Sequence, residues 1–308
     1  MRLLKAFILL FCTIIAICGC GDDKTISVSN NNTTNAGNKN SNRGVGSTVL
    51  ERLEFPKVKG GSSFVVTHST ASHGINYSLE WDSQKRSQRW SCYQMYASNT
   101  AGTSNVGRYD TQQNGYPQDP DIPVSKRFAS DPYWGSGYDH GHICPSADRQ
   151  YSEEANMQTF YISNMQPQRN VFNAGLWAKM ESQVRSWNSN AFRDTLFVCK
   201  GGTIDTIPDS SIKDPVMRKL SSGLIVPHYF FMAVLCKNSQ GYKAMAFWTE
   251  HYETDHTKDA LSTYVVNVRD LEEKTGIDFF CNLPDDVEER VETQDVATIL
   301  RIWNLTNK

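Results

Sequence analysis

The chain has 308 residues, of which 39% are hydrophobic and 11% aromatic, and its formal net charge at pH 7 is −2. This composition excludes a disordered chain, because so much apolar surface can fill a sizeable core. The slightly negative charge argues against a protein that coats nucleic acid with a long basic face, but not against a site that contacts a few phosphates.

The first twenty residues have the order of an export signal. Arg2 and Lys5 precede an apolar run from Ala6 to Ile17, which is too short to span a membrane. The run ends in Ile17-Cys18-Gly19-Cys20, which resembles the lipobox of bacterial lipoproteins and marks Cys20 for acylation. An ordinary signal peptide cleaved nearby is the alternative. We therefore expect residues 1–20 to be a lipoprotein signal peptide and the protein to be exported.

Residues 21–50 are rich in Asn, Ser, Thr and Gly and poor in large apolar side chains. Such a segment cannot bury enough surface to order itself, so it is expected to be a disordered tether ahead of one domain over residues 51–308. Asp22 and Asp23 resemble the acidic signals that send some lipoproteins to the outer cell surface. The expected location is therefore a bacterial membrane, at the outer membrane or cell surface, reached through an N-terminal lipid.

Short runs of β-branched or aromatic residues, bounded by turn residues, predict strands in two sheet regions. The first region comprises residues 64–68, 77–81 and 90–97, and the second comprises 196–199, 228–236 and 242–248, with a hairpin turn at 238–241.

Helices are predicted between and after these strands. Residues 173–187 carry Leu176, Met180 and Val184 at four-residue spacing, and residues 271–275 end at Gly276. The acidic stretch 285–295 is expected to be a solvated face or a mobile tail before a helix at 296–303. The class is α+β, in a single mixed domain.

Five cysteines remain once the leader is set aside, namely Cys92, Cys144, Cys199, Cys236 and Cys281. The number is odd, so at least one stays free or pairs outside the chain, and the pairing of the others is open.

The densest group of chemically capable residues lies at 138–149, where Asp139, His140, His142 and Cys144 stand close together. Asn173 follows 31 positions after His142, and Glu181 lies eight residues further on. On a regular helix Asn173 and Glu181 would be about 80° apart, so both can border one cavity.

Three ordered motifs carry a family resemblance: Asp139-x-Gly141-His142, then Ser163-Asn164-Met165-x-Pro167-Gln168, then Asn173 with Trp177 and Glu181. Together they resemble the DNA/RNA non-specific endonucleases, which include secreted bacterial nucleases and mitochondrial endonuclease G. The resemblance covers nearly all of residues 64–283. It implies a central antiparallel sheet with a ββα-metal, or His-Me finger, active site that cleaves DNA and RNA.

The resemblance also implies a role for each catalytic residue. His142 would be the general base, and Asn173 would bind Mg2+ (or Mn2+) through its carbonyl oxygen. Glu181 would hold a metal-bound water, and Arg108 is the best match for the arginine that steadies charge on the phosphate. The products would carry a 5′ phosphate and a 3′ hydroxyl. For Arg108 the alternative is that it only decorates a loop.

One position departs from the family pattern, because His140 stands where an arginine is usual. His140 could still bind substrate phosphate when protonated, and Arg149 is the second candidate for substrate binding. Asp139 is interpreted as a structural residue that fixes the turn.

A zinc site is the sharpest chemical alternative. His140, His142 and Cys144 alternate along a strand and would share one face, but no fourth ligand follows at a recognisable spacing. The alternative function is therefore an exported surface binding protein with a zinc site or an inactive nuclease fold. Trp134, Trp177 and Trp187 are candidates for stacking on bases, and helical spacing favours the core for the last two.

Overall fold

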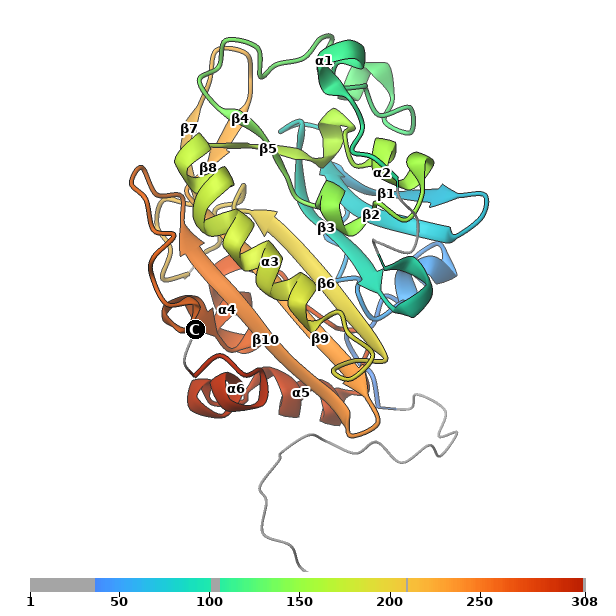
Figure 1. Ribbon diagram of the computed structural model, residues 1–308, viewed down its shortest axis with the longest axis vertical. Helices are drawn as coiled ribbons and strands as arrows, with labels where there is room; N and C mark the ends of the chain where they lie inside the picture. The colour runs from blue at the N-terminus through green and yellow to red at the C-terminus, as the bar shows by residue number, and fades with distance from the viewer. Residues whose placement is uncertain (1–36, 101–105, 209, 307–308) are drawn as a thin grey trace, which may run out of the picture.

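A seven-stranded antiparallel sheet forms the centre of the protein, seen in a computed structural model that describes residues 37–100, 106–208 and 210–306 (Figure 1). The strand order is β1-β2-β3-β6-β9-β10-β11. The strands are β1 (Ser63–Thr70), β2 (Gly74–Asp82), β3 (Ser87–Met95), β6 (Thr195–Gly202), β9 (Tyr229–Asn238), β10 (Gly241–Glu250) and β11 (Val265–Val266).

Two small two-stranded sheets stand at one end of the large one. They pair β4 (Asp139–His142) with β5 (Met165–Gln168), and β7 (Val216–Lys219) with β8 (Ile225–Pro227). The α-helices are α1 (Thr111–Asn114), α2 (Glu153–Gln158), α3 (Ala178–Trp187), α4 (Val268–Thr275), α5 (Asp285–Glu292) and α6 (Val296–Ile302). The α+β class is confirmed.

Helices cover both faces of the large sheet. α3 lies along one face, in front in Figure 1, and its Met180 and Val184 join a buried cluster with Trp303 after α6. The other face carries a second cluster to which α4 and α5 contribute Leu271 and Val287. Burial of these apolar residues on both faces is what holds the sheet and helices together.

The prediction of two sheet regions is wrong, because β3 pairs directly with β6. Cys92 lies opposite Cys199 in that pairing, which joins the early and late strands into one sheet. Local sequence patterns identify strands but not their partners, so this long-range pairing could not be predicted from them. All five cysteines of the described residues are buried thiols without a disulfide.

The predicted helix over residues 173–187 is interrupted. A π-helical segment, η6 (Phe172–Trp177), precedes α3, and Gly175 within it has φ −101° and ψ −107°, outside the helical range. A Cβ at Gly175 would lie 3.1 Å from Cγ2 of Thr257, so the close packing there favours glycine. The expected separation of about 80° between Asn173 and Glu181 assumed a regular helix, so it does not apply here. The glycine stop at Gly276 is confirmed by its φ of 64°.

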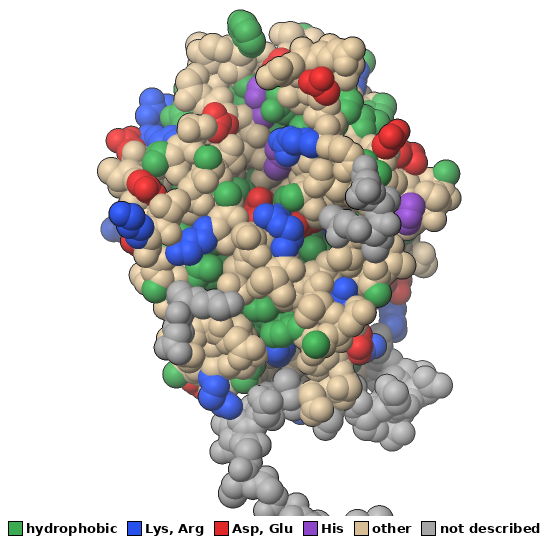
Figure 2. Space-filling model, in the orientation of Figure 1, with side chains coloured by type: hydrophobic (Ala, Val, Ile, Leu, Met, Phe, Trp, Pro, Cys, Tyr) green, Lys and Arg blue, Asp and Glu red, His purple; other side chains and the backbone are tan. Residues whose placement is uncertain are grey.

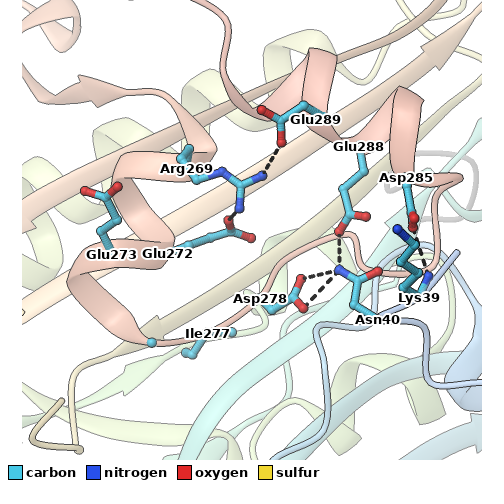
Figure 3. A pocket seen from close by; sticks show the side chains of 11 residues that line it. Lys39, Asn40, Arg269, Glu272, Glu273, Ile277, Asp278, Asp285, Glu288 and Glu289 are labelled. Atoms are coloured by element: carbon cyan, nitrogen blue, oxygen red, sulfur yellow. Dashed lines mark hydrogen bonds and ion pairs between the residues drawn. The ribbon is translucent and has the colours of Figure 1, made fainter. Parts of the chain in front are cut away.

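The described end of the predicted tether is bound to the domain. Asn38 donates to the backbone carbonyl of Cys281, and Asn40 donates to the carboxylates of Asp278 and Glu288 (Figure 3). The expectation of disorder is therefore wrong for residues 37–50, because it considered only apolar burial and not amide hydrogen bonds. Residues 21–36, like the leader and Cys20, lie outside the described residues.

The acidic stretch is a helix that is packed on one side and solvated on the other, and it is not a mobile tail. Val287 and Val291 of α5 are buried against the sheet, and Glu292 is also buried. Arg269 of α4 offsets the acidic charge by pairing with Glu292 and two other glutamates.

Among the residues described, no helix is long and apolar enough to cross a membrane.

Candidate active site

The site is built on two antiparallel strands, β4 and β5, and on the helical segment that follows β5. In the β4–β5 pairing, Gly141 lies opposite Gln166 and His142 opposite Met165. A Cβ at Gly141 would stand 2.3 Å from the side chain of Gln168 and 2.7 Å from the carbonyl oxygen of Gln166. Only glycine fits there, which explains the residue before His142 in the motif.

A cleft of about 450 Å³ opens beside the strands β4 and β5. Its lining brings together four residues singled out in the sequence as catalytic or metal-binding: Arg108, His142, Asn173 and Glu181. Asp139, His140, Trp177 and further residues complete the wall. Figure 2 shows histidine side chains in the hollow on this face, with basic and acidic side chains around them.

The His142 imidazole is prepared to accept a proton. Burial, with Arg108 as the second cause, lowers its pKa to about 3, so the ring is neutral near pH 7. The backbone of His140 opposes this lowering of the pKa, and Nε2 of His142 is buried without a hydrogen-bond partner within the described parts of the chain.

Asn173 is oriented by a neighbouring carboxylate. Its Nδ2 donates to Oδ2 of Asp139 at 2.9 Å, and Asn170 donates to the same oxygen at 3.0 Å. The interpretation of Asp139 as a turn residue is therefore wrong, because its carboxylate fixes the Asn173 amide. The Oδ1 carbonyl of Asn173 and the carboxylate of Glu181 are hard oxygen donors, which fit Mg2+ or Mn2+ better than a soft metal.

Glu181 has a buried cationic partner that the sequence did not reveal. The Nζ atom of Lys200, in the middle of β6, lies 3.2 Å from Oε1 of Glu181, and the lysine side chain is wholly buried. Burial raises the pKa of Glu181, and the charge of Lys200 opposes that rise. The only sequence signal was a lysine at the end of the apolar run 196–199, which normally indicates a strand edge.

Arg108 and His142 contact the same aromatic ring. Its guanidinium lies 4.8 Å from the ring centroid of Phe160, and the His142 ring contacts the same phenyl edge-on at 4.8 Å. The charge of Arg108 is also a cause of the lowered pKa of His142. Arg108 therefore belongs to the cleft and is not merely a loop decoration.

His140 is held by three neighbours. Its ring stacks on Tyr116 at 3.6 Å and on Tyr133 at 4.3 Å, and its Nε2 lies 2.9 Å from Oδ2 of Asp131. Nε2 is therefore taken, and any contact of His140 with a phosphate would have to use Nδ1. Asp131 was missed because nothing in the sequence links it to His140.

Arg149 does not bind substrate in this arrangement. It is completely buried, its guanidinium lies 4.4 Å from the ring centroid of Tyr93, and Nη2 donates to the backbone carbonyl of Gln94. The sequence suggested an exposed arginine next to the motif, but the short helical turn at Ser146–Asp148 is followed by a residue that points into the core.

The zinc alternative also fails on geometry. Cys144 is completely buried, its thiol pKa is raised to about 12, and His140 is engaged with Asp131. Cys144 also does not line the cleft, so the three residues do not present their side chains to one open site. A thiol that stays protonated at pH 7 is a poor nucleophile.

Another group outside the cleft could hold a metal. His68 of β1 lies 3.1 Å from Asp119 and 3.4 Å from Asp121, and the three ligand atoms lie within 4.8 Å of one another. His68 and Asp119 are buried, and Ser163 also donates to Asp119. The sequence did not suggest this group, because its members come from two distant segments.

Comparisons with known proteins agree with this geometry. A model of the DNA/RNA non-specific endonuclease family matches residues 63–286. The mitochondrial nuclease EXOG of Xenopus laevis is 28% identical over 229 residues, which cover 72% of this chain and 62% of the nuclease. Nuclease C1 of Cunninghamella echinulata is 29% identical over 210 residues, 68% of this chain and 81% of that protein.

A solved structure shows the same fold. The crystal structure of the EndoG/EndoGI complex aligns with a TM-score of 0.58 at 23% identity, over 73% of this chain and 89% of that chain. The chain thus spans about three fifths of the length of the EXOG nuclease and most of the aligned crystal-structure chain.

Proposed function

Because the chain belongs to the DNA/RNA non-specific endonuclease family, we propose that it is a metal-dependent endonuclease that hydrolyses phosphodiester bonds of DNA and RNA with little regard for sequence. The observation that carries the proposal is the cleft that combines His142, Asn173, Glu181 and Arg108. A binding module has no need for a neutral imidazole beside an oriented amide and a paired carboxylate.

The proton transfer in this proposal belongs to His142. Its neutral ring takes a proton from a water molecule that attacks the phosphorus atom. Arg108 lies on the same cleft and stabilises the negative charge that grows on the phosphate oxygens. Loss of the 3′ oxygen then leaves a 5′ phosphate and a free 3′ hydroxyl.

Asn173 would hold the metal ion, and Glu181 would hold a water molecule bound to that ion. A bound Mg2+ or Mn2+ would neutralise charge on the phosphate and on the leaving oxygen. Asp139 keeps Oδ1 of Asn173 available, and Lys200 opposes protonation of the Glu181 carboxylate and holds it in place. Asp139 and Lys200 order the ligand side chains before the ion binds, and this lowers the entropy cost of forming the site.

The test uses the full chain with plasmid DNA and with RNA. Cleavage of both is expected in millimolar Mg2+, loss of cleavage in EDTA, and recovery when Mg2+ is restored. The His142→Ala variant should still bind nucleic acid but cleave at least about 10²-fold more slowly. Near-parental cleavage by folded His142→Ala, or restoration by trace zinc alone, would show that the mechanism is wrong.

A further inference from the structure

Trp134 exposes almost its whole indole, in a loop that precedes the cleft residue Tyr138. Its exposed fraction is 91%, the highest of the large apolar side chains that the structure describes as exposed, ahead of Val124 at 72%. Single exposed apolar residues are common on protein surfaces, so exposure alone assigns nothing. A function is suggested by the place of Trp134 in the chain, because residues on both sides of it contact or line the cleft.

The loop that carries Trp134 is attached to the cleft wall on both sides. Before it, Asp131 binds the His140 ring and Tyr133 stacks on that ring. After it, the positive φ angles of Gly135 and Gly137, 67° and 80°, turn the chain back to the cleft lining at Tyr138. The loop that carries Trp134 is therefore anchored to the cleft wall on both sides of this residue.

Positive charge lies beside the same loop. The β7–β8 hairpin packs on it, because Leu220 and Leu224 share a buried cluster with Tyr133. Arg218 on that hairpin places its guanidinium 5.9 Å from the ring centroid of Tyr138. Arg218 and its neighbour Lys219 are exposed, and neither has an ion-pair partner among the residues described.

We propose that Trp134, Tyr138 and Arg218 form a stacking subsite for a nucleobase of single-stranded nucleic acid next to the cleaved phosphate. The indole would stack on the base, and Arg218 would contact the adjoining backbone phosphate. Stacking accepts every base, because each has a π face, so the subsite suits an enzyme that ignores sequence. The inference rests on the proposed function and names the form of nucleic acid that this side of the cleft prefers.

The test measures binding directly, in full-length protein that carries His142→Ala to prevent cleavage. The probe is a single-stranded oligonucleotide with a 2-aminopurine base, whose fluorescence falls when the base stacks. Adding Trp134→Ala should weaken binding roughly tenfold and abolish the quenching, whereas a fully paired duplex should be affected much less. Trp134→Phe should retain most of both effects, because a phenyl ring still stacks.

Val124→Ala is the matched control, since Val124 is exposed and apolar but lies in a different segment, Val124–Lys126, outside the loop that carries Trp134. It should bind both probes as the His142→Ala parent does. Equal binding by Trp134→Ala and that parent, or an equal loss in Val124→Ala, would overturn the subsite.

Cleavage by the wild-type chain separates this inference from the proposed function. If the wild-type chain cleaves but Trp134→Ala binds normally, only the subsite is wrong. If the quenching depends on Trp134 but the wild-type chain cleaves nothing with metal, the subsite stands and the endonuclease proposal fails.

Discussion

Asp139 holds Asn173 by a single hydrogen bond, in which Nδ2 of the amide donates to Oδ2 of the carboxylate over 2.9 Å. This contact decides which atom of the amide is available as a ligand, because an amide whose nitrogen is engaged must present its oxygen elsewhere. The motif residue is thereby connected to the proposed metal ligand on the following helix.

Asp139→Ala should therefore weaken metal binding. Removing a partner that orients a ligand typically costs 10- to 100-fold in metal affinity, so the Mn2+ concentration for half-saturation should rise about that much. Calorimetric titration of Mn2+ into the parent and the variant measures this. Asp139→Asn, which can still accept one hydrogen bond, is the milder control, and unchanged affinity in the alanine variant would contradict the orienting role.

The pH dependence of cleavage follows from the low pKa of His142. The active form is the neutral ring, and its pKa of about 3 in the free protein means that lowering the pH from 7 to 5 leaves the ring neutral. The value of kcat/KM should therefore stay level over that range, instead of falling near the ordinary histidine pKa of about 6.5.

Arg108→Ala tests the cause of this shift. Arg108 is the second cause of the lowered pKa, after burial, so its removal should raise that pKa and move the acid limb of kcat/KM to higher pH, besides reducing kcat. Arg108→Lys keeps the charge and serves as control. An acid limb at the same pH in the alanine variant would mean that Arg108 does not act on His142.

Lys200→Met should destabilise the protein, because it removes the buried partner of the Glu181 carboxylate, which is itself only 13% exposed. Breaking one side of a buried ion pair costs roughly 3–5 kcal/mol of unfolding free energy. The double variant Lys200→Met with Glu181→Gln should recover much of that loss, since neither charge remains. Urea denaturation of the single and double variants measures both values, and additive losses would argue that the pair does not interact.

The raised pKa of Glu288 predicts that the protein loses stability as the pH rises. Burial, opposed by the hydrogen bond from Asn40, raises its pKa to about 7 from an ordinary value of 4.5. A carboxyl group with a raised folded-state pKa favours folding while it is protonated, so this contribution declines between about pH 4.5 and 7. The melting temperature of Glu288→Gln should fall less over that range than that of the parent. If the melting temperatures of the parent and the variant fall equally with pH, Glu288 does not cause this pH dependence of stability.

Membrane attachment is proposed from the leader alone. If Cys20 carries the lipid, Cys20→Ala should move the protein from the membrane fraction to the soluble fraction, because acyl chains contribute about 0.8 kcal/mol per buried CH2. Fractionation of cells followed by immunoblotting measures this. A variant that stays with the membranes like the parent would rule out the lipid assignment.

The sequence by itself determined the family, the α+β class, the main strands and the residues around which the cleft is built. His142, Asn173 and Glu181 could be singled out because their types and order are carried by short motifs. Gly276 could be identified as a helix stop because a left-handed cap depends only on the local backbone.

Only the tertiary structure decided which groups meet. It joined the two strand regions through Cys92 and Cys199, directed Asp139 to Asn173, supplied Lys200 to Glu181, and buried Arg149 in the core. These contacts connect segments that are far apart in the chain or depend on which way a side chain points. Local patterns encode backbone conformation and burial, whereas the partner of a charged group is set by long-range packing.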